Sequence, residues 1–288
     1  MKNDKGDNME SYAKQGYLNS EFKLFHILDE TQKEFGYHYH DFDKLVIMIR
    51  GDVSYTIEGK TYPLQPYDIV FVRHNEIHRP VIHSSQLYER IIIYISPGFL
   101  HDYHTDTYNL GYCFEKAAME HSSVLRIPSL QKHPLFKSIQ KLESSFYDKE
   151  YAHELYRQVQ FLGFMIHLNR AVVSDSLDFL HNETGNIRII DIVKYINLHL
   201  TDNLTIDQIA EHFYISKYHM MRTFKKETGY SIGNYILQKR LTLSRELIFG
   251  GTPITEVCYL CGFKDYSNFS RHYKKFFRES PRETRHNL

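Results

Sequence analysis

The sequence predicts an α+β protein with more than one domain. We expect an N-terminal β-barrel with a helical segment, then a C-terminal all-α domain with two helix-turn-helix motifs joined by a long helix. Three observations predict this fold. Short β-rich runs separated by turns fill residues 22–96, the pattern becomes helical beyond Pro97, and one helix–turn–helix pattern occurs twice after residue 186. The 288 residues are enough for two domains with separate cores.

The N-terminal part begins with a polar stretch, residues 1–16, which we expect to be disordered. The barrel is expected over residues 17–133. Glu58-Gly59-Lys60 lies between two predicted strands and indicates a β-hairpin turn. Four runs have strand composition: 45–49, 53–57, 69–72 and 90–95.

A helical segment is expected over residues 134–173. Residues 152–173 are apolar on more than one face, so this helix is expected to pack against the barrel and against a partner helix. Residues 174–186 are rich in Ser, Asp and Asn, which indicates a linker. The C-terminal domain is then expected over residues 187–288.

The second copy of the repeated motif ends in a basic helix that follows a turn at Gly262. Asp265 is suited to cap this helix, and Phe269 and Tyr273 form its buried stripe. The opposite face is short, polar and cationic, which suits the major groove of DNA. The residues predicted to face DNA are Tyr266, Ser267, Asn268, Ser270, Arg271 and Lys274.

The first copy has the same pattern, with Ser216 as the cap and Gly229 as the stop of its second helix. Met220 and Phe224 are its predicted core positions. A helix of about 18 residues joins the copies and is roughly 27 Å long, so the two basic helices can enter successive major grooves about 34 Å apart. The predicted DNA-facing residues of this copy are Tyr218, Met221, Arg222 and Lys225.

The roles of these side chains follow from their chemistry. Arg222 and Arg271 are the strongest candidates for reading bases, because arginine can donate two hydrogen bonds to guanine. Lysines on the same faces are expected to bind phosphates. Met221 offers an apolar contact and no hydrogen bond, so we expect it to contact a methyl group, or its half of the DNA site to discriminate less.

The charge distribution supports this division of the chain. The whole protein has 35 basic and 35 acidic residues and no net charge. Residues 186–288 contain 16 basic and 10 acidic residues, a difference of +6, which leaves 19 and 25, or −6, for the rest. A basic domain joined to an acidic one is consistent with nucleic-acid binding by the C-terminal part. The three cysteines give no disulfide framework, and Cys258 and Cys261 fall on the predicted buried face of a helix.

The last hundred residues resemble the AraC/XylS family of bacterial transcription regulators. One departure is Arg278, where the family usually has a helix-ending glycine, and a left-handed Arg278 would cost about 1 kcal/mol more than glycine. The residues that carry the resemblance are Ile209-Ala210, Ser216, Phe224-Lys225-Lys226, Gly229, Ile254, Gly262-Phe263, Ser267, Phe269-Ser270-Arg271, Ser280-Pro281 and Arg285.

Residues 20–100 resemble, more loosely, the cupin-type sensor domain of the same regulators. Two departures are Tyr67, where a glycine is usual, and Lys44, where metal-binding cupins place a glutamate ligand. Because Lys44 would repel a cation, we expect no metal and no cofactor, although three nearby histidines form a tempting cluster. The matching stretches contain His38, His40, Gly51, Glu58-Gly59-Lys60, Asp68 and His78. The residues expected to line a ligand pocket are His38, His40, Tyr55, His78 and Arg79.

The resemblance implies a ligand-responsive regulator that binds double-stranded promoter DNA and is not an enzyme. It implies a homodimer formed through the helical segment, with RNA polymerase as a further partner. The small-molecule effector is unidentified, and a sugar is one candidate. The N-terminus is polar and the apolar runs are strand-sized, so we expect a cytoplasmic protein that does not enter the membrane. Two alternatives stay open: a constitutive regulator whose barrel only dimerises, and a cupin metalloenzyme with a DNA-binding tail.

Overall fold

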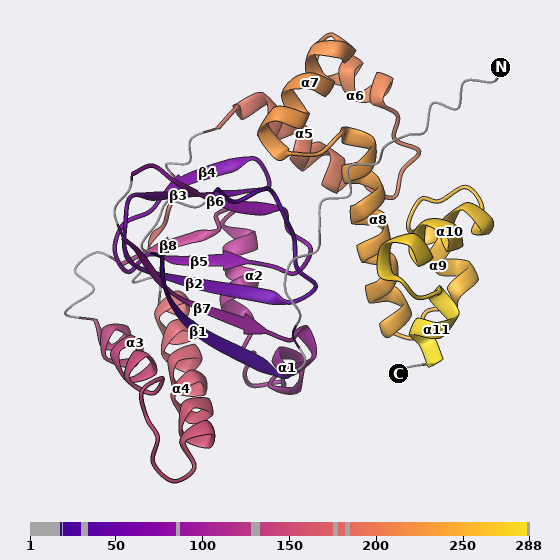
Figure 1. Cartoon of the computed structure of the whole chain (residues 1–288). Helices are drawn as coiled ribbons and strands as arrows, with labels where there is room; N and C mark the ends of the chain where they lie inside the picture. Colours follow the sequence, from indigo (N-terminus) through magenta and orange to yellow (C-terminus); the bar gives the residue numbers. More distant parts are fainter. Residues whose placement is uncertain are drawn as a thin grey trace, which may run out of the picture. The chain divides into compact units, whose positions relative to one another are not determined.

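The computed structural model of the chain describes residue 18 and residues 20–29, 34–84, 87–127, 133–174, 178–181 and 185–286. The predicted disordered stretch 1–16 lies outside these residues. The chain divides into two compact units, the first comprising residues 1–57 and 61–184 and the second residues 58–60 and 185–288 (Figure 1). No helix within the described ranges combines the length and the hydropathy that a membrane span needs.

The first unit is built on two β-sheets that lie one above the other in Figure 1. The larger sheet has the strand order β1-β7-β2-β5-β8-β9, and the smaller has the order β4-β3-β6. The strand pairs β1–β7, β2–β7, β2–β5, β5–β8, β8–β9 and β3–β6 are all antiparallel. The strands are β1 Phe22–Asp29, β2 Asp43–Arg50, β3 Val53–Ile57, β4 Lys60–Pro63, β5 Ile69–Val72, β6 His78–Ile82, β7 Tyr88–Ile95, β8 Val124–Arg126 and β9 Asp178–Phe179.

Alternate side chains of the central strands enter two separate cores. In β2, Leu45 and Ile47 pack with the helices on one face, whereas Val46 and Met48 pack with the smaller sheet on the other. Successive side chains of a strand point to opposite faces, so a strand covered on both sides must be apolar throughout. This explains why the apolar runs at 45–49, 69–72 and 91–95 are continuous rather than alternating.

The predicted hairpin forms between β3 and β4. Glu58 and Gly59 both have positive φ, 49° and 83°, which is the combination that two-residue hairpin turns of type I′ require. Gly51 has φ 135° between β2 and β3, and a β-carbon there would lie 3.1 Å from the carbonyl oxygen of Leu87. Glycine is needed at that turn for both conformation and space.

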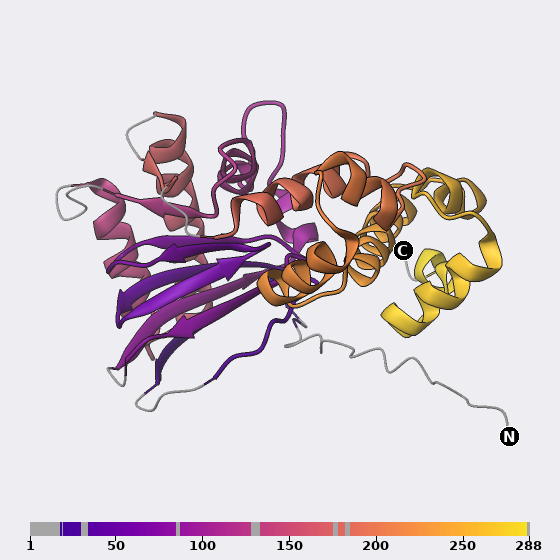
Figure 2. The same cartoon turned by 90° about the horizontal axis from the view of Figure 1, so that it is seen from above.

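Four helices cover the outer face of the larger sheet, and α3 and α4 run beside each other in both views (Figures 1 and 2). α3 begins with a proline in its first turn, and Nδ1 of His133 accepts a hydrogen bond from the amide of Leu135. Their bounds confirm the predicted helical pattern beyond Pro97. The helices are α1 Pro97–Asp102, α2 Tyr112–Met119, α3 Pro134–Ser144 and α4 His153–Val173.

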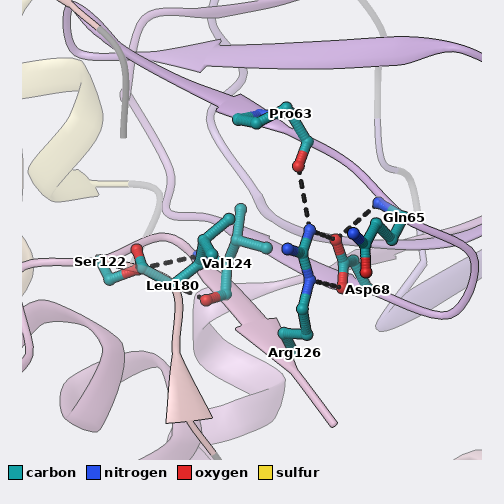
Figure 3. Close-up of polar contacts among 7 residues, drawn as sticks. All are labelled: Pro63, Gln65, Asp68, Ser122, Val124, Arg126 and Leu180. Atoms are coloured by element: carbon teal, nitrogen blue, oxygen red, sulfur yellow. Dashed lines mark hydrogen bonds and ion pairs between the residues drawn. The ribbon is translucent and has the colours of Figure 1, made fainter. Parts of the chain in front are cut away.

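The predicted linker, residues 174–186, contains the short strand β9. Ser122 Oγ donates to the carbonyl oxygen of Leu180 at 2.8 Å, and the amide of Leu180 donates to the carbonyl of Val124 at 2.8 Å (Figure 3). Part of this stretch is therefore held on β8 as an added strand of the larger sheet. Beside it, Arg126 makes two hydrogen bonds to the buried carboxylate of Asp68, of 2.9 and 2.6 Å (Figure 3).

The second unit is entirely helical in its described residues. The long helix α8 packs at both ends: Tyr235 meets Phe224 of α7 edge-on at 5.6 Å, and Leu241 and Ile248 enter a core with α9 and α10. α8 thus joins two small helical cores through one continuous rod. The helices are α5 Ile187–Leu198, α6 Ile206–His212, α7 Lys217–Thr228, α8 Ile232–Phe249, α9 Ile254–Leu260, α10 Tyr266–Phe277 and α11 Pro281–His286.

Candidate nucleic-acid interface and ligand site

The helix α7 is fixed by local signals at both ends. The Ser216 side chain accepts from the amide of His219, and Gly229 ends the helix with φ 81°. Met220 and Phe224 are fully buried, as predicted from their i, i+4 spacing. The opposite face is open to solvent, and its predicted DNA-facing residues Tyr218, Met221, Arg222 and Lys225 are all exposed.

The helix α10 repeats this construction. The carboxylate of Asp265 accepts from the amide of Asn268 at 2.7 Å, and Gly262 in the preceding turn has φ 77°. Phe269 and Tyr273 are fully buried. Arg278 ends the helix with φ 66°, so this position adopts the left-handed conformation although it is not a glycine.

The predicted DNA-facing residues of α10 differ in their exposure to solvent. Ser267, Asn268, Arg271 and Lys274 are exposed, whereas Tyr266 and Ser270 are only half-exposed. The Tyr266 ring packs edge-on against Phe269, with centroids 6.0 Å apart, because its position borders the buried stripe. The open face of α10 is therefore narrower than the sequence predicted.

Three of the predicted ligand-pocket residues form one buried cluster in the first unit. His38, His40 and His78 are each at most 4% exposed. Their ring centroids lie 4.4 to 5.1 Å apart. The Tyr55 ring is stacked toward His78 at 6.0 Å, so it adjoins the same cluster. His38 and His78 also pair through two backbone hydrogen bonds of 3.1 and 2.9 Å, which joins the segment before β2 to β6.

Arg79 lies apart from this cluster. It follows His78 in β6, where alternate residues point to opposite faces, and its burial is correspondingly lower. Its guanidinium lies over the Tyr37 ring, 4.1 Å from the centroid. The strand alternation therefore separates Arg79 from the histidines with which the sequence grouped it.

Lys44 belongs to the cluster although the sequence analysis treated it only as a departure from a pattern. Its Nζ donates to Tyr55 Oη at 2.8 Å and lies 3.4 Å from Nε2 of His78. The signal that marks it is a lysine in the otherwise apolar run 44–49. Burial is the main cause that lowers the pKa of Lys44 to about 7, and the nearby charge of Arg90 lowers it further.

His38 and His78 are held in their neutral form. Burial is the main cause that lowers the pKa of His38 to about 4. The hydrogen bond to the Gly36 carbonyl raises this pKa in part, and the charge of Lys44 lowers it further. Burial, followed by Lys44 and the two neighbouring histidines, holds the pKa of His78 well below its usual range. Burial also raises the pKa of Tyr55. The cluster thus contains two neutral imidazoles, those of His38 and His78, beside a lysine whose ammonium form is disfavoured.

Two family models match this chain. The AraC-like ligand binding domain matches residues 24–156, and a helix-turn-helix domain matches residues 209–287. Their order reproduces the two units described above. The chain belongs to the AraC family of transcription regulators.

The chain is also similar to several known proteins. The chain is 24% identical over 260 residues to the HTH-type transcriptional activator RhaS of Escherichia coli (strain K12 / DH10B), covering 88% of each protein. The C-terminal domain of AraT, a response regulator from Geobacillus stearothermophilus, is 26% identical over 36% of this chain and 87% of that chain, with a TM-score of 0.35. ToxT from Vibrio cholerae is 17% identical over 93% of this chain and 99% of that chain, with a TM-score of 0.36.

In this AraC-family chain, one arginine links the two helix-turn-helix motifs. Arg240 lies near the middle of α8 and donates to three backbone carbonyls: those of Leu200 at 2.8 Å, Asp202 at 2.6 Å and Gly262 at 2.8 Å. The first two lie between α5 and α6, and the third lies in the turn before α10. The sequence analysis missed Arg240, since a single arginine on a long amphipathic helix gives no sign of distant acceptors.

The two cysteines of α9 have a packing role. Cys258 and Cys261 are both fully buried in the core that α8, α9 and α10 share. Burial raises the pKa of the Cys258 thiol and raises that of Cys261 to about 12, so both stay protonated at neutral pH. This position agrees with the predicted buried face and gives neither thiol the features of a reactive cysteine.

Proposed function

We propose that this AraC-family regulator binds promoter DNA through the exposed faces of α7 and α10. The observation that carries the proposal is the repetition: two capped helices, each with an apolar stripe fully buried and a basic face exposed, stand on one rod-like helix. At 1.5 Å per residue the 18 residues of α8 span about 27 Å, which is comparable with the roughly 34 Å between successive major-groove sites.

The roles on α10 divide by chemistry. Arg271 reads a base edge, and Lys274 binds phosphate, with Ser267, Asn268 and Ser270 adding hydrogen bonds. On α7, Arg222 reads a base, Lys225 binds phosphate, and Tyr218 and Met221 add stacking and methyl contacts. Tyr266 supports α10 from the edge of its core, in keeping with its half-buried position.

The experiment that tests these roles measures the affinity of the full-length protein for DNA from its own upstream region at two salt concentrations. Arg271→Ala is expected to cost about 1–3 kcal/mol on the cognate sequence and to relax preference at one base pair. Lys274→Ala is expected to weaken all sequences alike and to reduce the salt slope by about one. Arg282→Ala, an exposed arginine on α11, is the matched control. A uniform loss of affinity in Arg271→Ala would refute its base-reading role.

We propose further that a small polar effector controls this binding from the barrel. The support is the cluster of His38, His40, His78 and Tyr55 with Lys44, because such a set of polar groups is costly to bury without a use. A sugar remains one candidate for the effector. The effector shifts the population of chains competent for promoter binding. A panel of sugars added to the same DNA-binding measurement tests this, and equal affinity with and without every compound would favour a constitutive regulator.

A homodimer is the third part of the proposal. On α4, Leu155, Val159 and Ile166 remain 60%, 53% and 44% exposed, although the other side of this helix is fully buried at Phe161 and Phe164. An exposed apolar stripe on a helix that is already packed is typical of a subunit interface. Sedimentation of the Leu155→Lys/Val159→Lys variant tests it: the wild-type chain is expected to be dimeric and the variant monomeric.

Transcription activation, with RNA polymerase as a further partner, completes the proposal and rests on the similarity to RhaS. We place the protein in the cytoplasm as a regulator rather than an enzyme. Reporter transcription from its own promoter region, with and without the gene, checks the direction of regulation. A decrease in transcription when the protein is present would make it a repressor.

A further inference from the structure

The last strand of the larger sheet comes from the segment that joins the two units. β9 lies at the end of the strand order and pairs with β8, where Phe179 stands opposite Leu125. Just after β9, the amide of Leu180 donates to the carbonyl oxygen of Val124 at 2.8 Å. We call residues 178–181 the strap. It is a part of the connection that the first unit takes into its own sheet.

The strap contributes one side chain to each of the two cores of the first unit. Phe179 is buried in the core under the helices, where its ring centroid lies 6.1 Å from that of Phe71. Leu180 is buried in the barrel core on the other face of the sheet. Tyr55 belongs to the same barrel core, and its hydroxyl accepts a hydrogen bond from Lys44. One packed core therefore includes both a strap side chain and a member of the proposed effector site.

The strand that receives the strap is held more firmly than the strap itself. β8 also pairs with β5. Arg126 in β8 makes two hydrogen bonds to the buried carboxylate of Asp68 and donates to the carbonyl of Pro63 at 3.0 Å (Figure 3). The strap is an edge segment, fastened by Ser122 Oγ, which donates to the carbonyl of Leu180 at 2.8 Å (Figure 3). A short edge segment opens locally at low free energy, so the strap can detach while β8 stays in place.

The packing of the barrel core determines how the strap responds to a bound molecule. Val70 and Val124, which share this core with Leu180, are fully buried. Protein cores are close-packed, so an added molecule makes room for itself by moving a side chain. Leu180 moves at the smallest cost, because its segment ends the sheet. Docking and release of the strap are thus two discrete states that the contents of the barrel can bias.

We propose that residues 178–181 are a conformational switch, in which an effector in the barrel displaces Leu180 and releases the strap from β8. This inference rests on the function proposed above. With the strap docked, the chain from His181 to Asn186, the N-cap of α5, spans at most about 18 Å. With the strap released, the chain from Ser174 at the end of α4 spans at most about 43 Å. The longer tether lets two DNA-binding units of the proposed dimer engage neighbouring sites together, so release raises the affinity for DNA.

The first test measures docking of the strap without DNA and without an effector. Hydrogen exchange of the full-length protein should show protection in the peptide that contains Leu180. Ser122→Ala removes the side-chain donor and should lower this protection about tenfold, and Leu180→Ala should lower it further. Peptides of β2 and β5 should keep their protection. Ser144→Ala is the matched control, since Ser144 Oγ also donates to a main-chain carbonyl but lies exposed on α3.

The second test locks the strap in place. Ser123 and His181 lie two positions beyond the pair of Leu125 and Phe179 in the antiparallel register, so their side chains face each other. Ser123→Cys/His181→Cys should form a disulfide on oxidation, which mass spectrometry detects. The oxidised double variant should bind DNA from the protein's own upstream region at least tenfold more weakly than the same protein reduced with dithiothreitol. The single variant His181→Cys is the control and should bind equally in both conditions.

The outcomes separate the switch from the proposed function. Equal or tighter DNA binding by the oxidised double variant would overturn the switch and leave DNA binding intact. Failure of the disulfide to form, or an unprotected Leu180 peptide in the wild type, would overturn the docked state. If Leu180→Ala fails to fold, judged by circular dichroism, Ser122→Ala and the disulfide still decide. Absence of DNA binding by the wild type and by the reduced variant would refute the proposed function and the switch together.

Discussion

Replacement of Arg240 should loosen two distant turns at once. Its guanidinium makes three hydrogen bonds, to the carbonyls of Leu200, Asp202 and Gly262, at 2.6–2.8 Å. Arg240→Met keeps the apolar stem of the side chain and removes all three donors. A hydrogen bond whose acceptor can turn to water contributes about 1 kcal/mol, so the three together stabilise the turns by about 3 kcal/mol.

Hydrogen exchange on the full-length protein, read by mass spectrometry, measures this locally. At roughly 1.4 kcal/mol per tenfold change, a loss of about 3 kcal/mol lowers protection about a hundredfold. The loss should fall on peptides over residues 199–204 and 259–265, where the amide of Phe263 donates to the carbonyl of Cys258. Arg240→Lys keeps the charge but not the planar guanidinium, so protection of the same peptides should fall about tenfold.

Arg188→Met on α5 is the control, because Arg188 is exposed. This variant should leave the hydrogen-exchange protection of both peptides unchanged. The reasoning fails if Arg240→Met stays within threefold of wild-type protection in both peptides, or if only one of the two turns loosens. The second result would mean that Arg240 does not link the motifs energetically.

Three further predictions concern stability. Gly262→Ala should lose more than about 2 kcal/mol in urea unfolding, because φ is 77° and the new β-carbon would lie 2.7 Å from the carbonyl oxygen of Thr201. Arg278→Gly should gain about 0.5–1 kcal/mol in the same assay, since Arg278 holds φ 66° at the end of α10. Burial lowers the pKa of His38 to about 4, against 6.5 in the unfolded chain. The contribution of neutral His38 to the free energy of unfolding is therefore complete above pH 6.5, and it falls by roughly 3 kcal/mol as the pH drops toward 4. In the His38→Gln variant the thermal unfolding temperature should vary less with pH over that range. A pH dependence identical to that of the wild type would contradict this.

The helices of the second unit could be predicted because their signals are local. Asp265 and Ser216 cap helices that begin at the next residue, and Gly229 and Gly262 adopt the positive φ expected of them. A cap depends on atoms within one turn, so a sequence pattern contains most of the information. The long strand runs were predictable for a similar reason, since burial on both faces requires continuous apolar residues.

The short strands could not be predicted. β8 and β9 have three and two residues, and they exist because Val124 pairs with Val70 and Leu125 pairs with Phe179. These partners lie more than fifty residues apart, so no local pattern records them. The same limit explains why residues 178–179 were assigned to a linker.

The candidate site was predicted in part. The histidine spacing grouped His38, His40 and His78, and the structure brings them together. The contacts of Lys44 and of Arg240 were missed because their partners are distant in sequence. The sequence placed Tyr266 on the open face of α10, but its ring packs against Phe269. The exposure of a residue that borders the buried stripe depends on such packing, which helical spacing alone does not predict.

The two cores on either side of the larger sheet separate two kinds of evolutionary change. Val46 and Met48 lie in the barrel core, and their neighbours Leu45 and Ile47 lie under the helices. Substitutions at every second position can therefore alter what the barrel accepts while the helical layer keeps its packing. A single inserted residue has the opposite effect, since it would exchange the two sets at once. Point substitutions in these strands can therefore change the lining of the barrel alone, whereas insertions and deletions should be tolerated only in the turns.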